Sequence, residues 1–139
     1  MSPIPEVLTG WNVLVVEDEE DSRIVATMML EMAGASVVGT ANGVEALKAM
    51  RRALPDFILS DLSMPEMDGW QLINELKQNR DTFEIPVIAL TAHAMPGDRE
   101  RAIKAGFVNH LTKPLDPDKF IHQLLGLLVE IPLFVGRIA

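Results

Sequence analysis

The sequence of 139 residues contains no cysteine and no tyrosine, and its 12 basic residues are outnumbered by 20 acidic ones. Without cysteine, the chain forms no disulfide, no thiolate zinc site and no cysteine nucleophile. The net charge of −8 argues against nucleic acid and anionic membranes as partners. No apolar run reaches the roughly 18 residues of a transmembrane helix, and the N-terminus lacks signal-peptide features. The expected location is therefore the cytoplasm.

The length and the hydrophobic content define the expected scale of the fold. A hydrophobic content of 48% supplies a sizeable core, and 139 residues fit one ordinary domain. A core domain of this size leaves no room for a second full domain. We therefore expect no fused DNA-binding or catalytic output domain in this sequence.

Five short apolar or β-branched segments alternate with longer segments that carry helix signals. The expected strands are residues 13–16, 37–40, 57–60, 87–90 and 107–111. The first, third and fourth are almost continuously apolar, as in parallel strands buried on both faces, whereas the other two are weaker, as in edge strands. Five strand–helix units predict an α/β fold with a parallel sheet that is covered by helices on both faces.

Charged and turn-forming residues mark the expected helices. The first helix has an acidic first turn at Glu19–Asp21 and ends at Gly34. Pro96 is expected to open the fourth helix, and Asp116-Pro117 the fifth. The apolar residues of the first helix are expected to fill the core. They include Ile24, Met28, Met29, Leu30 and Met32.

Polar side chains stand where the expected strands end. Glu17 and Asp18 follow the first strand, and Asp61 follows the third. Thr91 follows the fourth strand, and Lys113 comes just after the fifth. Because the carboxyl ends of parallel strands share one edge of the sheet, these five side chains are expected to line one crevice, where open α/β sheets bind ligands.

The chemistry of this crevice follows from its charges. Three neighbouring carboxylates repel one another unless a cation lies between them. Mg²⁺ suits the position, since it binds one or two carboxylates together with water and phosphate oxygens. A carboxylate can also attack phosphorus to give an aspartyl phosphate. The metal, the ammonium group and the hydroxyl group would then neutralise the transferring oxygens.

Four motifs carry a family resemblance. In chain order they are VLVVEDEED, LSDLSMPEMDGW, VIALTAHA and HLTKPL. With these motifs at the usual separations, the sequence resembles the receiver domain of two-component response regulators, in particular the single-domain, chemotaxis-regulator-like members. The resemblance implies a flavodoxin-like, doubly wound (βα)5 three-layer sandwich with a parallel sheet of order 2-1-3-4-5. It covers residues 11–129, with residues 1–10 as a loose arm and 130–139 as an apolar tail.

The resemblance also implies a metal site and a phosphoacceptor. Asp61 is the expected phosphoacceptor and is also a ligand of Mg²⁺. Asp18 and the backbone carbonyl of Ser63 are the other protein ligands that the resemblance implies. Glu17 occupies the second position of the acidic pair and is expected to act on the metal through water.

Further roles are implied around the phosphoryl group. Thr91 is the expected switch hydroxyl, and Lys113 is expected to pair with phosphate oxygens and to precede a cis peptide bond. Ser63 and His93 stand two residues after Asp61 and Thr91, where side chains tune the lifetime of the phosphoryl group.

Two positions depart from the usual pattern of the family. Glu17 stands where aspartate is common, which adds a methylene group without changing the charge. His110 stands where tyrosine or phenylalanine is usual, so the resemblance does not by itself imply the coupled rotation of Thr91 and an aromatic ring in this chain. Because histidine changes charge near neutral pH, we expect partner contacts that vary between about pH 6 and about pH 7.5.

The implied function is signalling rather than turnover of a substrate. Asp61 would take a phosphoryl group from a phosphohistidine of a sensor histidine kinase or a histidine phosphotransfer protein. The face formed by the fourth helix, the fifth strand and the fifth helix would then bind a downstream protein. The chain would catalyse only its own phosphorylation and dephosphorylation.

Other interpretations stay open beside this one. A metal-dependent phosphohydrolase could use a similar sheet, but the usual Asp-x-Asp pair is absent, because Asp18 is followed two residues later by Glu20. A flavin-binding module is rejected, because an acidic loop after the first strand repels phosphate. The chain could be a receiver excised from a hybrid histidine kinase. It could also form a homodimer through the fifth helix and the apolar tail.

Overall fold

The computed structural model describes residues 6–92 and 96–137, and its strands and helices alternate along the chain. In chain order they are β1 (Asn12–Val16), α1 (Glu20–Met32), β2 (Ser36–Thr40), α2 (Gly43–Arg52), β3 (Phe57–Asp61), α3 (Gly69–Gln78), β4 (Val87–Thr91), α4 (Asp98–Ala105), β5 (Asn109–Thr112), α5 (Phe120–Leu128) and the short 3-10 helix η1 (Pro132–Phe134). None of the helices in this part of the chain is both long enough and apolar enough to cross a membrane.

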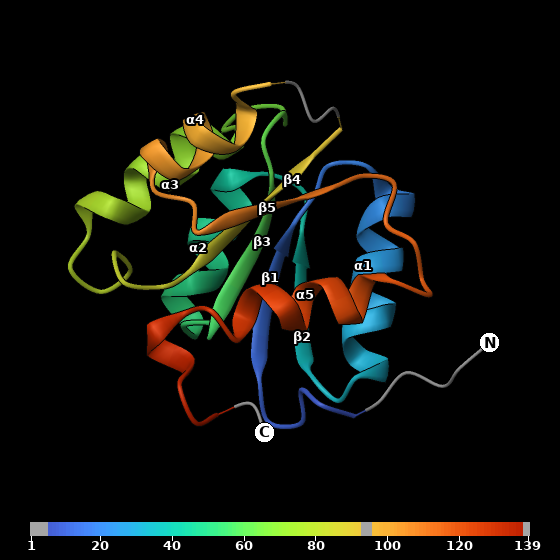
Figure 1. Ribbon diagram of the computed structural model, residues 1–139. Helices are drawn as coiled ribbons and strands as arrows, with labels where there is room; N and C mark the ends of the chain where they lie inside the picture. The colour runs from blue at the N-terminus through green and yellow to red at the C-terminus, as the bar shows by residue number, and fades with distance from the viewer. Residues whose placement is uncertain (1–5, 93–95, 138–139) are drawn as a thin grey trace.

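The five strands form one parallel sheet of order β2-β1-β3-β4-β5 (Figure 1). This confirms the predicted doubly wound α/β fold. The strand order reverses between β1 and β3, because the chain runs outward from β1 to β2 and then crosses back to β3. Side chains at the carboxyl ends of β1 and β3 therefore flank the crevice at which such sheets bind ligands.

Two apolar layers lie between the sheet and its helices. Helices α1 and α5 cover one face, and α2, α3 and α4 cover the other (Figure 1). Successive residues of β1 alternate between the two layers, with Val15 packed under α1 and α5 and Val16 on the opposite side. Both side chains are fully buried. The continuous apolar run of this strand thus reflects burial on both faces.

The prediction for the buried face of α1 was wrong in part. Met28 and Met32, which were expected in the core, are 55% and 53% exposed. Ile24 is also exposed, and the helix instead buries a face that contains Ala26 and Met29. The helix carries apolar residues on two sides, so its periodicity fits two orientations, and packing against the sheet selects the one that includes the small alanine.

Two predicted helix starts were also wrong. Pro96 precedes α4, because Gly97 has a left-handed backbone with φ of 90° and the helix begins only at Asp98. Asp116 and Pro117 precede α5, since residues 117–119 form a turn and the helix begins at Phe120. The last strand is shorter than predicted and begins at Asn109 instead of residue 107.

Both terminal segments are anchored to the domain in their described parts. In the segment expected to be a loose arm, Leu8 is fully buried and its amide donates to the carbonyl of Ala33. In the tail, Phe134 packs edge-to-face on Trp11 at 4.7 Å between ring centroids. Arg137 forms an ion pair with Asp56 at 2.8 Å and also stacks over the Trp11 ring. The tail therefore closes the core at the amino-terminal end of the sheet, although Leu133 and Val135 are exposed.

Candidate functional site

The expected site residues come together at the carboxyl edge of the sheet. Glu17 and Asp18 directly follow β1, and Asp61 and Thr91 are the last residues of β3 and β4. Carboxylate oxygens of Glu17, Asp18 and Asp61 lie within 4.8 Å of one another. Glu17 and Asp61 are buried, whereas Asp18 is exposed. The parallel sheet thus brings together carboxylates that are more than 40 residues apart in the chain.

Lys113 bridges two of the carboxylates. Its ammonium nitrogen Nζ lies 2.8 Å from Oε1 of Glu17 and 3.0 Å from Oδ2 of Asp61. The residue follows β5 and precedes a cis bond to Pro114, as expected. One ammonium group therefore serves a cluster of three carboxylates, which leaves the site with excess negative charge.

The pKa values at the site reflect burial and this shared charge. Burial, followed by the neighbouring Asp61, raises the pKa of Glu17 to about 7. Burial also acts to raise the pKa of Asp61, but hydrogen bonds with Glu17 and Lys113 outweigh it and hold that pKa below its ordinary value. Burial acts to lower the pKa of Lys113, and the two carboxylates outweigh it and raise that pKa. Asp61 is thus ionised at neutral pH, and the proton that the cluster takes up below about pH 7 resides on Glu17.

Backbone groups fix the orientation of Asp61. The amides of Leu62 and Ser63 donate to its Oδ1, at 2.8 Å and 3.4 Å, which leaves Oδ2 for Lys113. Gly69, at the start of α3, approaches so closely that a side chain there would overlap the carbonyl oxygen of Asp61. The Leu62 amide could not be identified from the sequence, because a backbone N–H group leaves no signal in the side-chain pattern.

The expected switch residues lie on β4 and β5, the two strands beyond β3 in the sheet. Thr91 is 5% exposed, and within the described part of the chain its hydroxyl oxygen has no hydrogen-bond partner. The buried ring nitrogen Nδ1 of His110 is also unpartnered among the residues that the structure describes. Such orphaned buried atoms are uncommon in folded proteins. His93 lies outside the described residues, so its predicted tuning role stays a prediction.

The donor set fits a hard divalent cation. The cluster offers only oxygen ligands, and Mg²⁺ binds one or two carboxylates while it keeps several waters. Asp18 is exposed, as a ligand of a partly hydrated ion must be. Ser63 lies exposed in the loop after β3. Its carbonyl as a third protein ligand stays a prediction.

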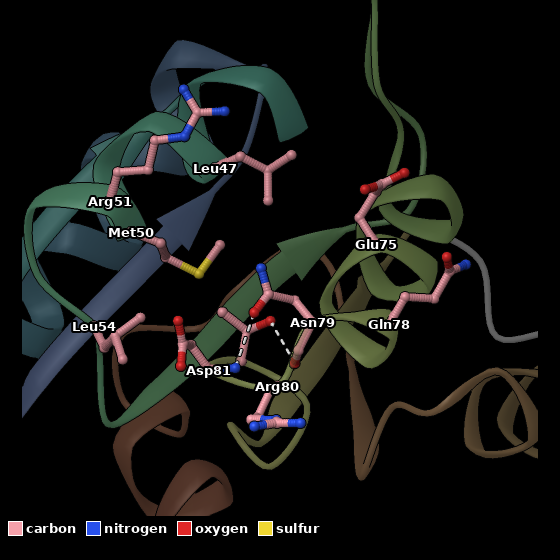
Figure 2. A pocket seen from close by; sticks show the side chains of 10 residues that line it. Leu47, Met50, Arg51, Leu54, Glu75, Gln78, Asn79, Arg80 and Asp81 are labelled. Carbon is pink, nitrogen blue, oxygen red and sulfur yellow. Dashed lines mark hydrogen bonds between the residues drawn. The ribbon is translucent and has the colours of Figure 1, made fainter.

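A cleft between α2 and α3 lies apart from this cluster. It has a volume of about 620 Å³ and is bordered by the C-terminal halves of the two helices and the loop that follows α3 (Figure 2). In Figure 2, Leu47 and Met50 of α2 lie opposite Glu75 and Gln78 of α3. Among the described residues, none of the expected site residues lines this cleft. The cleft is therefore separate from the cluster of carboxylates at the carboxyl edge of the sheet.

Comparison with known proteins identifies the family. The family model described as the response regulator receiver domain matches residues 13–125. The chain belongs to the response regulator receiver domain family. This receiver chain is 42% identical over 127 residues to an uncharacterised 14.6 kDa protein of Leptolyngbya boryana, an alignment that covers 91% of the chain and 97% of the relative. It is 37% identical to the polar-differentiation response regulator DivK of Brucella anthropi over 81% of the chain and 92% of DivK.

A solved receiver domain of a sensor kinase offers a structural comparison. The receiver domain of the sensor histidine kinase PA1611 from Pseudomonas aeruginosa superimposes with a TM-score of 0.75 and 33% identity. The superposition covers 86% of this chain and 98% of that receiver. That structure holds a magnesium ion coordinated in its active-site cleft. Membership of the family places the chain in two-component signalling.

Proposed function

We propose that Asp61 accepts a phosphoryl group from a phosphohistidine of a sensor histidine kinase or a histidine phosphotransfer protein, with Mg²⁺ in the site. The observation that carries the proposal is the cluster of Glu17, Asp18 and Asp61, in which Lys113 binds two of the three carboxylates. Such a concentration of carboxylates, two of them buried, is tolerable when a cation binds it. The magnesium-bound receiver of PA1611 supports this choice of ion.

Each residue of the site has a separate role in the transfer of the phosphoryl group. A carboxylate oxygen of Asp61 attacks phosphorus, the bond from phosphorus to the histidine nitrogen breaks, and the aspartyl phosphate forms. Asp18, Asp61 and the carbonyl of Ser63 would hold Mg²⁺, with Glu17 acting through water, and the ion supplies neutralisation of the phosphoryl oxygens. Lys113 already contacts Asp61 and would pair with a phosphoryl oxygen.

Phosphorylation is proposed to switch a binding face. It adds negative charge beside Thr91, whose hydroxyl group has no partner among the described residues and can donate to the new oxygens. His110 lies on the neighbouring strand, and its buried Nδ1 likewise has no partner in the described part of the chain, so it can respond to the same change. The face formed by α4, β5 and α5 would then bind a downstream protein, as a two-state element biased by phosphorylation. A second possibility is that α5 and the tail bind another copy of this chain to form a homodimer.

A phosphotransfer profile against the sensor kinases of the host tests the proposal. We expect rapid transfer from one kinase or relay protein to the wild-type chain and none to Asp61→Asn, which keeps the shape of the side chain but lacks the nucleophile. Transfer to no kinase from a folded wild-type chain would contradict the proposal. Turnover of generic phosphomonoesters would instead favour a phosphohydrolase. If the only phosphoryl donor is a kinase domain that belongs to the same polypeptide, the chain is the receiver domain of a hybrid histidine kinase.

A further inference from the structure

The loop between β3 and α3, residues 62–68, has an unfavourable backbone and is held from several sides. Glu66 has a left-handed φ of 64°, which is costly for a residue with a side chain. At the two ends of the loop, the amide of Gly69 donates to the carbonyl of Leu62 at 3.1 Å. Asp68 caps α3 in a capping box with Gln71. A further contact, made by another element, holds the loop at the residue before this cap.

The first residue of α2 supplies that contact. The amide of Gly43 donates to the carbonyl of Met67 at 3.0 Å. A Cβ atom at Gly43 would lie 2.6 Å from Cγ and 2.8 Å from Sδ of Met67, so the two residues are in close contact. The preceding Asn42 is buried and caps α2 by accepting from the amide of Glu45. The helix end that holds the loop is therefore itself well fixed.

We propose that Gly43 is a positioning residue for the phosphoacceptor site, which acts by clamping Met67 and with it the loop after Asp61. The inference rests on the proposed function, because the same loop supplies the amides of Leu62 and Ser63 that orient Asp61. The clamp reaches the site from α2, an element that contributes none of the expected site residues. Since coupling between two equilibria is reciprocal, a clamp that favours Mg²⁺ binding must itself be strengthened by Mg²⁺.

Three variants test the clamp. Gly43→Ala introduces the close contact with Met67, while the backbone of Gly43, which is not left-handed, accepts alanine without strain. In the double variant Gly43→Ala with Met67→Ala, the two nearest Met67 atoms are removed, and of the three close contacts only the one with Met67 Cβ, at 2.9 Å, is left. Gly126→Ala is the matched control, because a Cβ at this exposed position of α5 meets nothing within 4 Å.

The first readout is the Mg²⁺ dissociation constant, measured by isothermal titration calorimetry. We expect Gly43→Ala to weaken binding about fivefold, the factor that follows from the net loss of one hydrogen bond. The control should stay within about twofold of the wild type by the same conversion. The double variant should recover part of the lost affinity, because two of the three close contacts are gone. An unchanged constant in folded Gly43→Ala would overturn the proposal, and so would a weakening that the double variant fails to reduce.

The second readout needs only the wild-type protein and so does not depend on the folding of any variant. Amide hydrogen exchange of Gly43, followed by NMR, should slow when Mg²⁺ is added, while exchange of the Gly126 amide should stay unchanged. Equal exchange at Gly43 with and without bound Mg²⁺ would overturn the clamp. A wild-type chain that binds no Mg²⁺ would overturn the proposed function as well, which separates the two failures.

Discussion

The buried carboxyl group of Glu17 makes the stability of the metal-free protein depend on pH. Burial and the neighbouring Asp61 raise the pKa of Glu17 from 4.5 to about 7 in the folded protein, whereas the unfolded chain keeps the ordinary value. Between these values the folded state binds one more proton than the unfolded state, so the free energy of unfolding falls as pH rises. At about 1.4 kcal/mol per pH unit, the fall amounts to about 3 kcal/mol and is complete above about pH 7.

Urea titrations that follow tryptophan fluorescence measure this effect. They are run in a metal chelator from about pH 5 to about pH 8. In this range Asp61, whose pKa is lowered, stays ionised, and Lys113, whose pKa is raised, stays protonated. The matched variant is Glu17→Gln, which cannot ionise. All other titrating groups are common to both proteins, so the difference between their stability curves isolates Glu17. We expect the wild type to lose about 2.5 kcal/mol more than Glu17→Gln across this range, because part of the fall lies below about pH 5.

Saturating Mg²⁺ should remove the loss at the high end of the range. Ligand at about 100 times its dissociation constant stabilises the folded state by about 2.7 kcal/mol. The gain should be larger at about pH 8 than at about pH 5, because a bound cation favours the ionised form of Glu17. Parallel stability curves for the wild type and Glu17→Gln without metal would refute the assignment of the proton to Glu17.

Three further predictions concern stability and are checked by the same titrations. Gly69→Ala should lower the free energy of unfolding by about 1–3 kcal/mol, because the added Cβ overlaps the backbone of Asp61. An unchanged free energy would contradict this and would mean that the loop moves to make room for the methyl group. Met29→Ala should lower the free energy of unfolding by about 2–5 kcal/mol, because Met29 is buried, whereas Met28→Ala, at an exposed position, should lower it by less than about 0.5 kcal/mol. Equal losses would contradict the orientation of α1. Phe134→Ala should cost about 3–5 kcal/mol, and no loss would mean that the tail is not part of the core.

The sequence predicts the elements that are governed by local patterns. Strands β1, β3 and β4 are buried on both faces, so their unbroken apolar runs identify them without knowledge of the fold. The convergence of Asp18 and Asp61 follows from the same reasoning, because any parallel sheet brings the carboxyl ends of its strands to one edge. The charges at the strand ends then predict a cation.

Features that depend on tertiary packing could not be predicted in this way. The orientation of α1 is set by contact with the sheet, which buries Ala26 and leaves Met28 exposed. The packing of Phe134 on Trp11 joins two ends of the chain, and no local pattern connects them. The contact of Gly43 with Met67 involves a backbone amide and a backbone carbonyl, which every sequence supplies at every position other than proline.

The central claim is that Asp61 forms an aspartyl phosphate in a magnesium-dependent reaction. The most direct test is intact mass spectrometry of the protein after incubation with acetyl phosphate and Mg²⁺. The account predicts one base-labile phosphoryl adduct on the wild type, and none on Asp61→Asn or on the wild type in a metal chelator. An adduct of equal yield on Asp61→Asn, or no adduct on the folded wild type with Mg²⁺ present, would contradict it.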